Sequence, residues 1–400
     1  MTAAPLTLSP DQQVVLDAIL VWLKDPARQV LTVGGYAGCG KTVLIKHLTD
    51  QMSAQMGDIA QLDPTDTEDL TYADLMDGPT NPSGASSVEV LTPTGKAAHV
   101  LRRKGVYAST AHSHLYRAHR DKKTGELHFS LKERDEIHRS LFIVDEASMV
   151  DERLHTDLLR HCDKLLYVGD HGQLPPVGKG LNLMASPALR LEKIHRQALG
   201  NPLIAFAHHL RGGGMPIPYS RTRTDNDPRL IIGLRPGTPR HGPGVINICA
   251  THRTRLNLNA VIRRSLGRKD ALEVGDPLIC LANNQQLGVF NGMTATVAAV
   301  HSLHKTTARV DLTLDDGNLL TQLPLDPRAL DCAKLDDIFP KGPPRDSTYW
   351  SYAHAVTCHK AQGSEWDTVI VSDEYVPIWP MPQWRYTAAT RASTTLIWNP

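Results

Sequence analysis

Eight residues near the start of the chain have the types and spacing of a phosphate-binding loop. Residues 35–42 follow the pattern G-x-x-x-x-G-K-T and lie between the apolar run 30–33 and the apolar-periodic stretch 43–48. This context predicts a strand, a glycine-rich loop and a helix. Glycines let backbone N–H groups converge on a polyphosphate, and the start of the helix adds a positive dipole end. The segment predicts a nucleoside triphosphate site; the alternative is a glycine-rich turn without a ligand.

The side chains of this loop suit the charges of a triphosphate and its metal ion. Lys41 is expected to neutralise the β- and γ-phosphates, and the Thr42 hydroxyl is expected to ligate Mg²⁺. The glycines expected to line the phosphates are Gly35, Gly38 and Gly40.

Two further turns that follow apolar runs carry polar side chains of the kinds that hydrolysis needs. Asp145 and Glu146 come directly after the run 141–144. Asp145 is expected to hold Mg²⁺, and Glu146 to orient or deprotonate the attacking water. Gln173 follows the run 165–168 and could contact the γ-phosphate. From spacing alone, an exposed glutamine in a proline-rich turn is an equal alternative.

The order of the expected elements predicts an α/β fold with a parallel sheet, because strands alternate with helices. A helix is expected over residues 11–24, with Ser9 as N-cap and Pro10 at its first position. A second helix is expected over 95–104 and a short one near 358–362. The expected strands are 30–33, 88–91, 141–144, 165–168, 368–371 and one around 395–397.

Several segments depart from this alternation. Residues 57–87 are acidic and then rich in glycine and proline, which predicts a solvated surface insertion. Residues 115–140 suit a β-hairpin, 212–243 are expected to be loops, and 275–322 predict a small β-barrel or sheet.

Composition sets broad limits. The 400 residues predict two to four domains, and a formal net charge of +1 means that any nucleic-acid groove must be a local basic patch. No apolar run predicts a membrane span or a signal peptide. The six cysteines form no C-x-x-C pair and the nineteen histidines are scattered, so we expect free thiols in a reducing cytoplasm and no structural metal. By analogy alone, the compact size favours an enzyme of a bacterium or of a phage-infected host.

Taken together, the motifs resemble those of superfamily 1 DNA helicases, in the RecD-like and Dda-like branch that moves 5′→3′. The resemblance covers nearly the whole chain in the order typical of that branch. The matching segments are residues 8–12, 35–42, 91–98, 109–112, 145–149, 169–176, 191–197, 356–365 and 386–392.

The resemblance implies two RecA-like P-loop domains with a β-hairpin insert and an SH3-like β insert. It assigns residues 1–189 to the first RecA-like domain (1A), with the hairpin (1B) at about 115–140. Residues 190–266 and 346–400 form the second RecA-like domain (2A). Residues 267–345, which include the motif-like stretch 275–292, form the SH3-like insert (2B).

The resemblance also implies that the nucleotide is ATP, with Mg²⁺. Gln12 is the expected reader of adenine, and Glu365 is expected beside the nucleotide. Arg196 and Arg391 are expected to contact the γ-phosphate, which would then be bound in a cleft between the two domains. Closing and opening that cleft would move one domain relative to the other along a DNA strand.

The expected partners are single-stranded DNA and forked duplex DNA, with replication or recombination proteins as further partners. We expect a monomer that does not bind membranes. Contacts should go to the DNA backbone rather than to bases. The residues assigned to DNA are Thr92, Pro93, Thr94, Lys96, Thr110, His112, Thr357 and His359, and one or two of the hydroxyls are expected to be local helix caps instead.

Two residues depart from the family pattern without touching an assigned catalytic group: His171 replaces a small or charged polar residue, and Cys358 an aliphatic one. Two other functions stay open. One is a DNA-stimulated translocase that remodels nucleoprotein without separating strands, and the other is a P-loop switch that hydrolyses slowly. Gln173, Arg196 and Arg391 favour a translocase over a switch, and the pathway, whether replication, recombination or repair, is left open.

Overall fold

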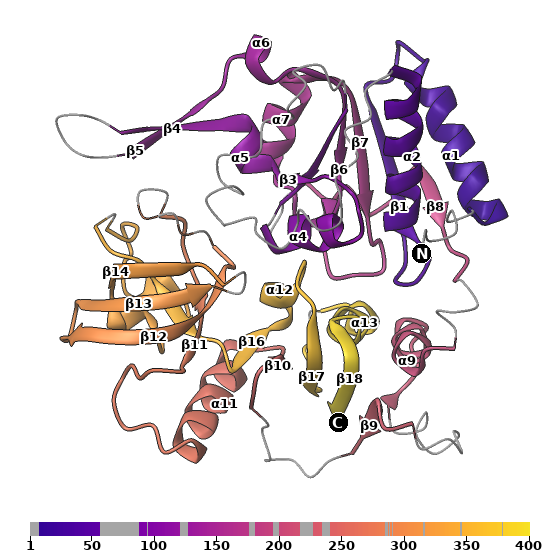
Figure 1. Cartoon of the computed structure of the whole chain (residues 1–400). Coiled ribbons are helices and arrows are strands. Elements are labelled where there is room, and N and C mark those ends of the chain that lie inside the picture. Colours follow the sequence, from indigo (N-terminus) through magenta and orange to yellow (C-terminus); the bar gives the residue numbers. More distant parts are fainter. Residues whose placement is uncertain are drawn as a thin grey trace, which may run out of the picture. The chain divides into compact units, whose positions relative to one another are not determined.

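Two parallel β-sheets lie in two separate units of the chain, as the alternation of elements predicts (Figure 1). Apart from residues 120–128, the first unit extends to Ala205 and the second begins at Phe206. The computed structural model describes residues 8–56, 88–93, 95–120, 127–175, 181–194, 200–216, 227–233, 241–284, 287, 289, 291–314, 317–344, 346–377 and 379–400. The acidic insertion predicted at 57–87 lies outside these residues, and no helix within them is long and apolar enough to cross a bilayer.

The first unit contains a six-stranded sheet in the order β3-β2-β6-β7-β1-β8, with every neighbouring pair parallel. Its strands are β1 (Val30–Gly35), β2 (Val88–Thr92), β3 (Ser109–Thr110), β6 (Arg139–Val144), β7 (Cys162–Gly169) and β8 (Leu189–Leu191). Its helices are α1 (Pro10–Leu23), α2 (Lys41–Met56), α4 (Gly95–Arg103), α5 (Ala111–Leu115), α6 (Arg134–Ile137) and α7 (Glu152–Arg160). The strands predicted here and the strand–loop–helix of residues 30–48 are confirmed.

The register of this sheet positions the motifs. Strand β1 lies between β7 and β8, with Gly34 opposite Gly169 on one side and Arg190 on the other. Strand β6 pairs with β7 up to Val144 opposite Tyr167. Because the strands are parallel, their carboxyl ends share one edge of the sheet, where ligand sites of such sheets form. The phosphate-binding loop, the Asp145 turn and the Gln173 turn therefore begin at the same edge.

Helix α1 begins with the predicted cap. Ser9 is extended (φ −73°, ψ 162°), its hydroxyl accepts a hydrogen bond from the Gln12 backbone N–H, and Pro10 is the first helical residue. The Gln12 side chain accepts in return from the Ser9 backbone N–H at 2.9 Å, which completes a capping box. The cap thus fixes the Gln12 side chain at the start of α1.

The second unit contains a five-stranded parallel sheet in the order β16-β10-β17-β18-β9. The strands are β9 (Leu230–Ile232), β10 (Val245–Cys249), β16 (Ala355–Thr357), β17 (Trp366–Ser372) and β18 (Ala392–Asn399), and the helices are α9 (Pro202–Arg211), α11 (His252–Ser265), α12 (Cys358–Ala361) and α13 (Met381–Ala389). The prediction of loops throughout 212–243 is wrong at β9. Three residues are too few for periodicity, and pairing with β18 makes them a strand.

A separate antiparallel sheet occupies the segment predicted to be a small barrel or sheet. Its order is β14-β13-β12-β11-β15. The strands are β11 (Pro277–Cys280), β12 (Thr294–Leu303), β13 (Ala308–Leu314), β14 (Leu319–Leu325) and β15 (Trp350–Tyr352), followed after β14 by 3₁₀ turns at Pro327–Ala329 and Leu335–Asp337. Strand β15 pairs with β11, so this sheet includes residues beyond 345. The domain boundaries stay a prediction.

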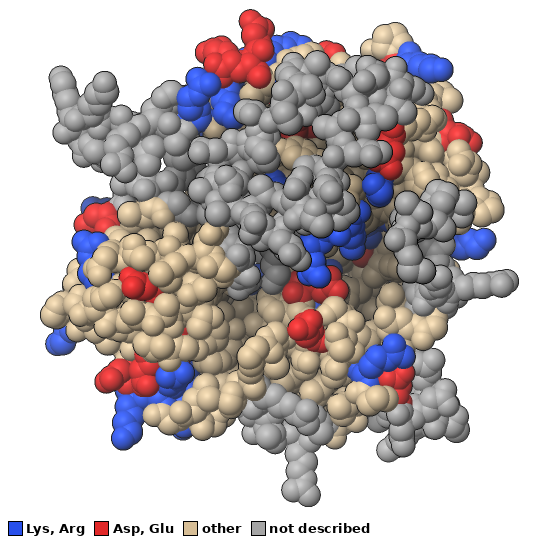
Figure 2. All heavy atoms as spheres, viewed as in Figure 1, with Lys and Arg blue, Asp and Glu red and all other residues tan. Residues whose placement is uncertain are grey.

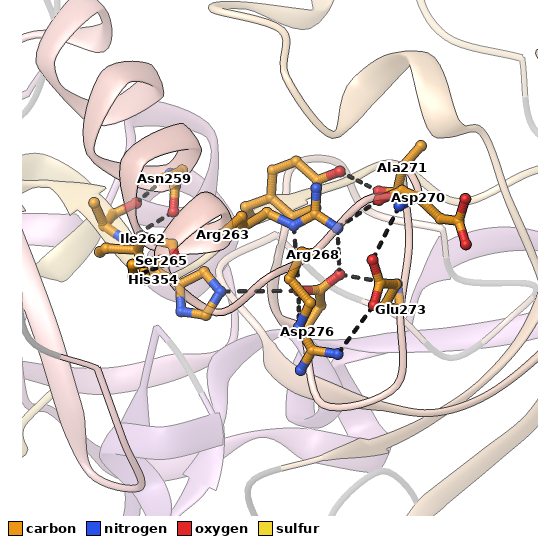
Figure 3. Close-up of polar contacts among 12 residues, drawn as sticks. Asn259, Ile262, Arg263, Ser265, Arg268, Asp270, Ala271, Glu273, Asp276 and His354 are labelled. Atoms are coloured by element: carbon orange, nitrogen blue, oxygen red, sulfur yellow. Dashed lines mark hydrogen bonds and ion pairs between the residues drawn. The ribbon is translucent and has the colours of Figure 1, made fainter.

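A buried ion cluster joins α11 to the antiparallel sheet (Figure 3). Asp276, just before β11, is fully buried and accepts from Arg263 of α11 at 2.9 Å. Arg268 lies 3.7 Å and His354 3.9 Å from the same carboxylate. Burial alone would raise the pKa of Asp276, but His354 and Arg263 outweigh burial and lower that pKa. The carboxylate is therefore charged at neutral pH and fastens the sheet to α11.

Replacing Asp276 with asparagine is expected to lower the free energy of unfolding by about 3 kcal/mol, because it leaves Arg263 without its buried counter-charge. Since the pKa of Asp276 is lowered, this contribution is present at neutral pH and is lost only in acid, below the ordinary carboxyl range. Urea unfolding at pH 7 measures it. Asp270→Asn is the control, because Arg263 contacts only the backbone carbonyl of this exposed residue. Equal stability of the two variants would show that the cluster contributes little.

Candidate active site

The phosphate-binding loop connects β1 to α2 in the form that the sequence predicts. Gly38 and Gly40 have φ values of 81° and 80°, a left-handed conformation that favours glycine. Lys41 begins α2, and its ammonium group donates to the carbonyl oxygens of Gly35 at 2.7 Å and Tyr36 at 3.1 Å. Thr42 follows as the second residue of α2. The lysine is therefore held on its own loop, where its charge faces the loop interior.

Three carboxylates surround this lysine. Asp170, in the turn after β7, lies 4.0 Å from the Lys41 ammonium. Burial lowers the pKa of Lys41, but Asp170 and the other nearby acidic groups, including Glu146 and Asp145, raise it overall. Lys41 is thus positively charged at neutral pH, as the neutralisation of phosphates requires.

The Asp145–Glu146 pair carries an excess of negative charge. Desolvation and the neighbouring Glu146 raise the pKa of Asp145 to about 6, although Lys41 opposes the shift. Glu146 has φ 54° and ψ 41°, which is a strained conformation for a residue with a side chain. A divalent cation beside Asp145 would favour its charged form.

The Gln173 turn is linked to the phosphate-binding loop through Asp170. The Asp170 carboxylate accepts from the Gln173 side-chain amide at 3.3 Å and from the Gly172 backbone at 2.9 Å. Gln173 is 6% exposed. The predicted γ-phosphate contact is therefore a buried side chain connected to Lys41 by a single carboxylate, and it is not the exposed glutamine of the alternative.

Gln12 lies against the same loop. Its side-chain amide donates to the carbonyl oxygens of Cys39 and Gly40, both at 3.2 Å, and its side chain is buried. The capping box of α1 therefore presents Gln12 to the phosphate-binding loop rather than to open solvent.

Two buried polar atoms at these turns fit a site that a polar ligand completes. Ser148 Oγ and Gln173 Oε1 have no hydrogen-bond partner among the described residues. Buried polar groups are normally satisfied, so such atoms indicate a missing partner. Together with the charged lysine, the glycine loop and the raised pKa of Asp145, the residues present fit a nucleoside triphosphate with Mg²⁺, which Thr42 and Asp145 would hold.

Arg391 lies in the turn between α13 and β18 and is 6% exposed. Its guanidinium donates to the carbonyls of Thr387 and Ser364, both at 3.2 Å, and to the Thr390 hydroxyl at 3.1 Å. These bonds use three of its five N–H donors and leave one on each terminal nitrogen. No ion pair within the described ranges involves Arg391. Glu365 is exposed directly before β17, and Arg196 lies outside the described residues.

The residues assigned to DNA divide into several kinds. Thr92 is fully buried and donates to the Ser109 carbonyl at 3.5 Å, so a DNA contact of its side chain has no geometric support. Thr110 is the N-cap of α5 and accepts from the Ser113 backbone, one of the local caps that the sequence predicts. Pro93 is half-buried, Thr94 lies outside the described residues, and the Lys96 side chain is not described.

The other assigned residues lie near aromatic rings or in the interior. His112 is exposed and stacks on Tyr116, with ring centroids 5.6 Å apart. His359 contacts Trp379 edge to face at 4.9 Å, and Thr357 is buried at the N-cap of α12. Basic side chains gather near α4 (Figure 2), where Arg103 and Lys104 are exposed at the end of the helix. This is a local basic patch of the kind that a nearly neutral chain needs for nucleic acid.

Sequence reasoning missed several contacts that the structure forms at functional elements. The ring of Tyr36, in the phosphate-binding loop, contacts the ring of His171 in a tilted arrangement. The Tyr116 hydroxyl donates to Asp157 at 2.5 Å, and the Glu374 carboxylate accepts from the backbone of Ala250 and Thr251 at the start of α11. Each pair is distant in sequence, so no local pattern signals it.

Comparison with known proteins agrees with this geometry. A family model for an AAA domain matches residues 7–224, which is more than half of the chain, and a model for the UvrD-like helicase C-terminal domain matches residues 352–397. The chain therefore belongs to the AAA-domain family, and its last part matches the C-terminal domain of UvrD-like helicases. The predicted resemblance to superfamily 1 helicases is confirmed at this level, and the 5′→3′ direction stays a prediction.

Individual relatives support the same family. The ATP-dependent RecD2 DNA helicase of Deinococcus radiodurans is 30% identical over 334 residues, which are 76% of this chain and 42% of that protein. An uncharacterised protein of Methanocaldococcus jannaschii is 30% identical over 159 residues, covering 36% of this chain and 11% of that protein. The chain thus spans less than half the length of these relatives.

Solved structures show the fold. Pif1 helicase from Bacteroides, in complex with ADP-AlF3 and single-stranded DNA, has a TM-score of 0.54 at 18% identity, with 99% of this chain and 93% of that chain covered. Pif1 helicase from Candida albicans has a TM-score of 0.50 at 18% identity, covering 98% of this chain and 94% of that chain. The predicted fold class of two RecA-like α/β domains is confirmed at this level.

Proposed function

We propose that this chain is an ATP-dependent DNA helicase that moves 5′→3′ along single-stranded DNA and unwinds duplex DNA. The observation that carries the proposal is that Asp170 lies between Lys41, which forms an ion pair with it at 4.0 Å, and Gln173, which donates a hydrogen bond to it at 3.3 Å. Through Asp170, the position of the Gln173 turn can change when Lys41 binds a phosphate. Family membership and the name of the RecD2 relative support the choice of DNA helicase among P-loop functions.

The chain's own residues have distinct roles in hydrolysis. Lys41 and the loop N–H groups bind the phosphates, and Thr42 and Asp145 hold Mg²⁺. Glu146 orients the attacking water and takes its proton, while Gln173 contacts the γ-phosphate. When bound, ATP supplies the phosphoryl group whose transfer to water drives the cycle. Gln12 recognises the base, and Glu365 lies beside the nucleotide.

Coupling to DNA is assigned to two arginines that are distant in sequence from the phosphate-binding loop. Arg391, with Arg196, stabilises the charge that develops on the γ-phosphate. Because both arginines would bind the γ-phosphate, the two domains close when ATP is bound and open after hydrolysis. The DNA strand is held by its backbone through Pro93, Thr94, Lys96, His112, Thr357 and His359. We propose that the protein acts as a monomer on forked DNA.

Stimulation of ATP hydrolysis by single-stranded DNA tests this proposal against the P-loop switch. A helicase or translocase is expected to hydrolyse ATP many times faster with single strands than without them. An equal rate with and without DNA would support a switch and contradict the proposal.

The hairpin of β4 (Tyr116–Arg120) and β5 (Leu127–Leu131) is proposed as the wedge that separates strands. A two-stranded hairpin is marginal alone and needs support. Its base is bonded to its own unit: the Tyr116 hydroxyl donates to Asp157 of α7, and Arg117 donates to Glu136 of α6 at 3.1 and 3.2 Å. The Lys132 ammonium donates to the Ser113 carbonyl at 3.0 Å. A base fixed in this way can resist the force of a strand drawn past it.

Replacing residues 120–128 with a short Gly-Ser link is expected to abolish unwinding of a 5′-tailed duplex, because the wedge is removed. Hydrolysis stimulated by single strands should stay largely intact, since the hairpin base and the nucleotide site are unchanged. Unwinding and ATPase assays on the same preparation provide the comparison. Full unwinding by this variant would place the wedge elsewhere, and loss of both activities would show that the hairpin serves the motor itself.

A further inference from the structure

Two aromatic rings meet beside the phosphate-binding loop. Tyr36 belongs to the loop that follows β1, and His171 to the turn that follows β7. Their ring centroids are 4.1 Å apart, with the ring planes inclined at 40°. Neither side chain has a role in the hydrolysis proposed above, and His171 is a position where the chain departs from the family pattern.

The strand register fixes this contact. Strands β1 and β7 are parallel neighbours with Gly34 opposite Gly169, so the residues after each strand leave the sheet side by side. A Cβ at Gly34 would lie 2.7 Å from His171 Nδ1 and 2.4 Å from Pro187 Cγ. The segment of Pro187 is itself held, because the Ala188 N–H donates to the Thr32 hydroxyl at 2.9 Å. The imidazole therefore fills a space that only glycine leaves open.

The imidazole is held by packing rather than by hydrogen bonds. Both ring nitrogens are buried, and neither has a hydrogen-bond partner in the described part of the chain. Burial lowers the pKa of His171, although Asp170 opposes the shift, so the ring is neutral at pH 7. A neutral ring without hydrogen bonds acts through its shape and its contact with Tyr36.

Tyr36 carries this contact to the catalytic lysine. Its backbone carbonyl accepts from the Lys41 ammonium at 3.1 Å and from the Cys39 N–H at 3.3 Å. The loop and the Gln173 turn are thus joined twice, by the polar Lys41–Asp170 contact and by the apolar Tyr36–His171 contact. The Tyr36–His171 contact therefore involves the same residue whose carbonyl accepts the hydrogen bond from Lys41.

We infer that His171 is a positioning residue that acts through Tyr36 to hold the phosphate-binding loop in the form that binds ATP. The inference rests on the proposed ATP site and adds a determinant of nucleotide affinity to it. Loss of a ring pair of this kind corresponds to about a two- to tenfold change in an equilibrium constant. The effect should fall on nucleotide affinity, because the substitutions leave Asp145 and Glu146 in place.

A double-mutant cycle tests the pair. The probe is a fluorescent, non-hydrolysable ATP analogue with Mg²⁺, titrated into His171→Ala, Tyr36→Ala and the double variant. Each single change is expected to weaken binding of the analogue by about two- to tenfold. The double variant should bind the analogue as tightly as the single variant with the lower affinity. His171→Phe should restore wild-type affinity, since it keeps a ring without nitrogens. The KM for ATP should rise in His171→Ala by the same factor, with kcat changed less than twofold.

A second histidine–tyrosine contact in the same unit serves as the control. His155 lies on α7, contacts Tyr167 with ring centroids 5.7 Å apart and is hydrogen-bonded to its hydroxyl at 2.8 Å. Among the described residues no hydrogen bond or ring contact links it to the loop, so His155→Ala should leave affinity unchanged. Additive losses in the cycle would overturn the inference, as would His171→Phe binding no better than His171→Ala. A wild-type protein that binds no analogue would instead refute the proposed ATP site and the ring pair with it.

Discussion

Replacing Arg391 with alanine is expected to reduce DNA-stimulated ATP hydrolysis by about 10³-fold, which is the scale of an arginine that stabilises phosphoryl transfer. The guanidinium has two N–H groups left after its bonds to Thr387, Ser364 and Thr390, so it can take an anion while it stays anchored. Affinity for single-stranded DNA without nucleotide should change little.

Further variants and a DNA-binding assay distinguish this role from that of a simple positive charge and from that of a contact to the DNA backbone. Arg391→Lys keeps the charge but loses the planar fork, and it should recover only part of the activity. Arg264→Ala removes an exposed arginine from α11 of the same unit and should leave the rate unchanged. If Arg391→Ala instead lost DNA affinity and kept its ATPase activity, Arg391 would be a contact to the DNA backbone. Thermal unfolding of each variant checks that the fold is retained.

Replacing Glu146 with glutamine is expected to lower turnover by about 10²–10³-fold while nucleotide binding is kept. The amide has the shape of the carboxylate but cannot accept the proton of the attacking water. Lys41→Ala should behave differently, because it removes the charge that neutralises phosphates and should weaken binding itself. Titration with a labelled ATP analogue and steady-state rates distinguish the two variants.

A matched control exists for the Glu146 substitution. Glu152 is exposed in the first turn of α7 in the same unit, and Glu152→Gln should be indistinguishable from wild type. Turnover close to normal in Glu146→Gln would remove Glu146 from the chemistry. The raised pKa of Asp145 would then make that residue the first alternative to test.

The local parts of the site could be predicted from the sequence. The phosphate-binding loop, the Asp145–Glu146 turn and the Ser9 cap each depend on residues that are close in the chain. Their glycine positions, carboxylates and capping hydroxyl act within one turn, so the pattern carries the geometry. The parallel sheet could also be predicted, because strands alternate with helices along the chain.

Other features depend on which strands become neighbours, and no local pattern contains that information. Thr92 resembles a surface donor in sequence, but it is buried because β2 pairs with both β3 and β6. The contact of Tyr36 with His171 needs the pairing of β1 with β7. Residues 230–232 form strand β9 because they pair with β18. The ion-pair partners of Asp276 come from α11 and from residue 354. Each of these features depends on contacts between residues that are far apart in the sequence.

Unwinding of duplexes with one single-stranded tail tests the central proposal most directly. Two substrates of the same sequence carry the tail at the 5′ or the 3′ end of the loading strand, and strand separation is followed with ATP and Mg²⁺. We predict that the 5′-tailed duplex is separated, that the 3′-tailed duplex is not, and that Glu146→Gln separates neither. Separation of the 3′-tailed duplex alone would contradict the proposed direction. Stimulated hydrolysis without separation of either substrate would contradict the helicase and leave the nucleoprotein translocase.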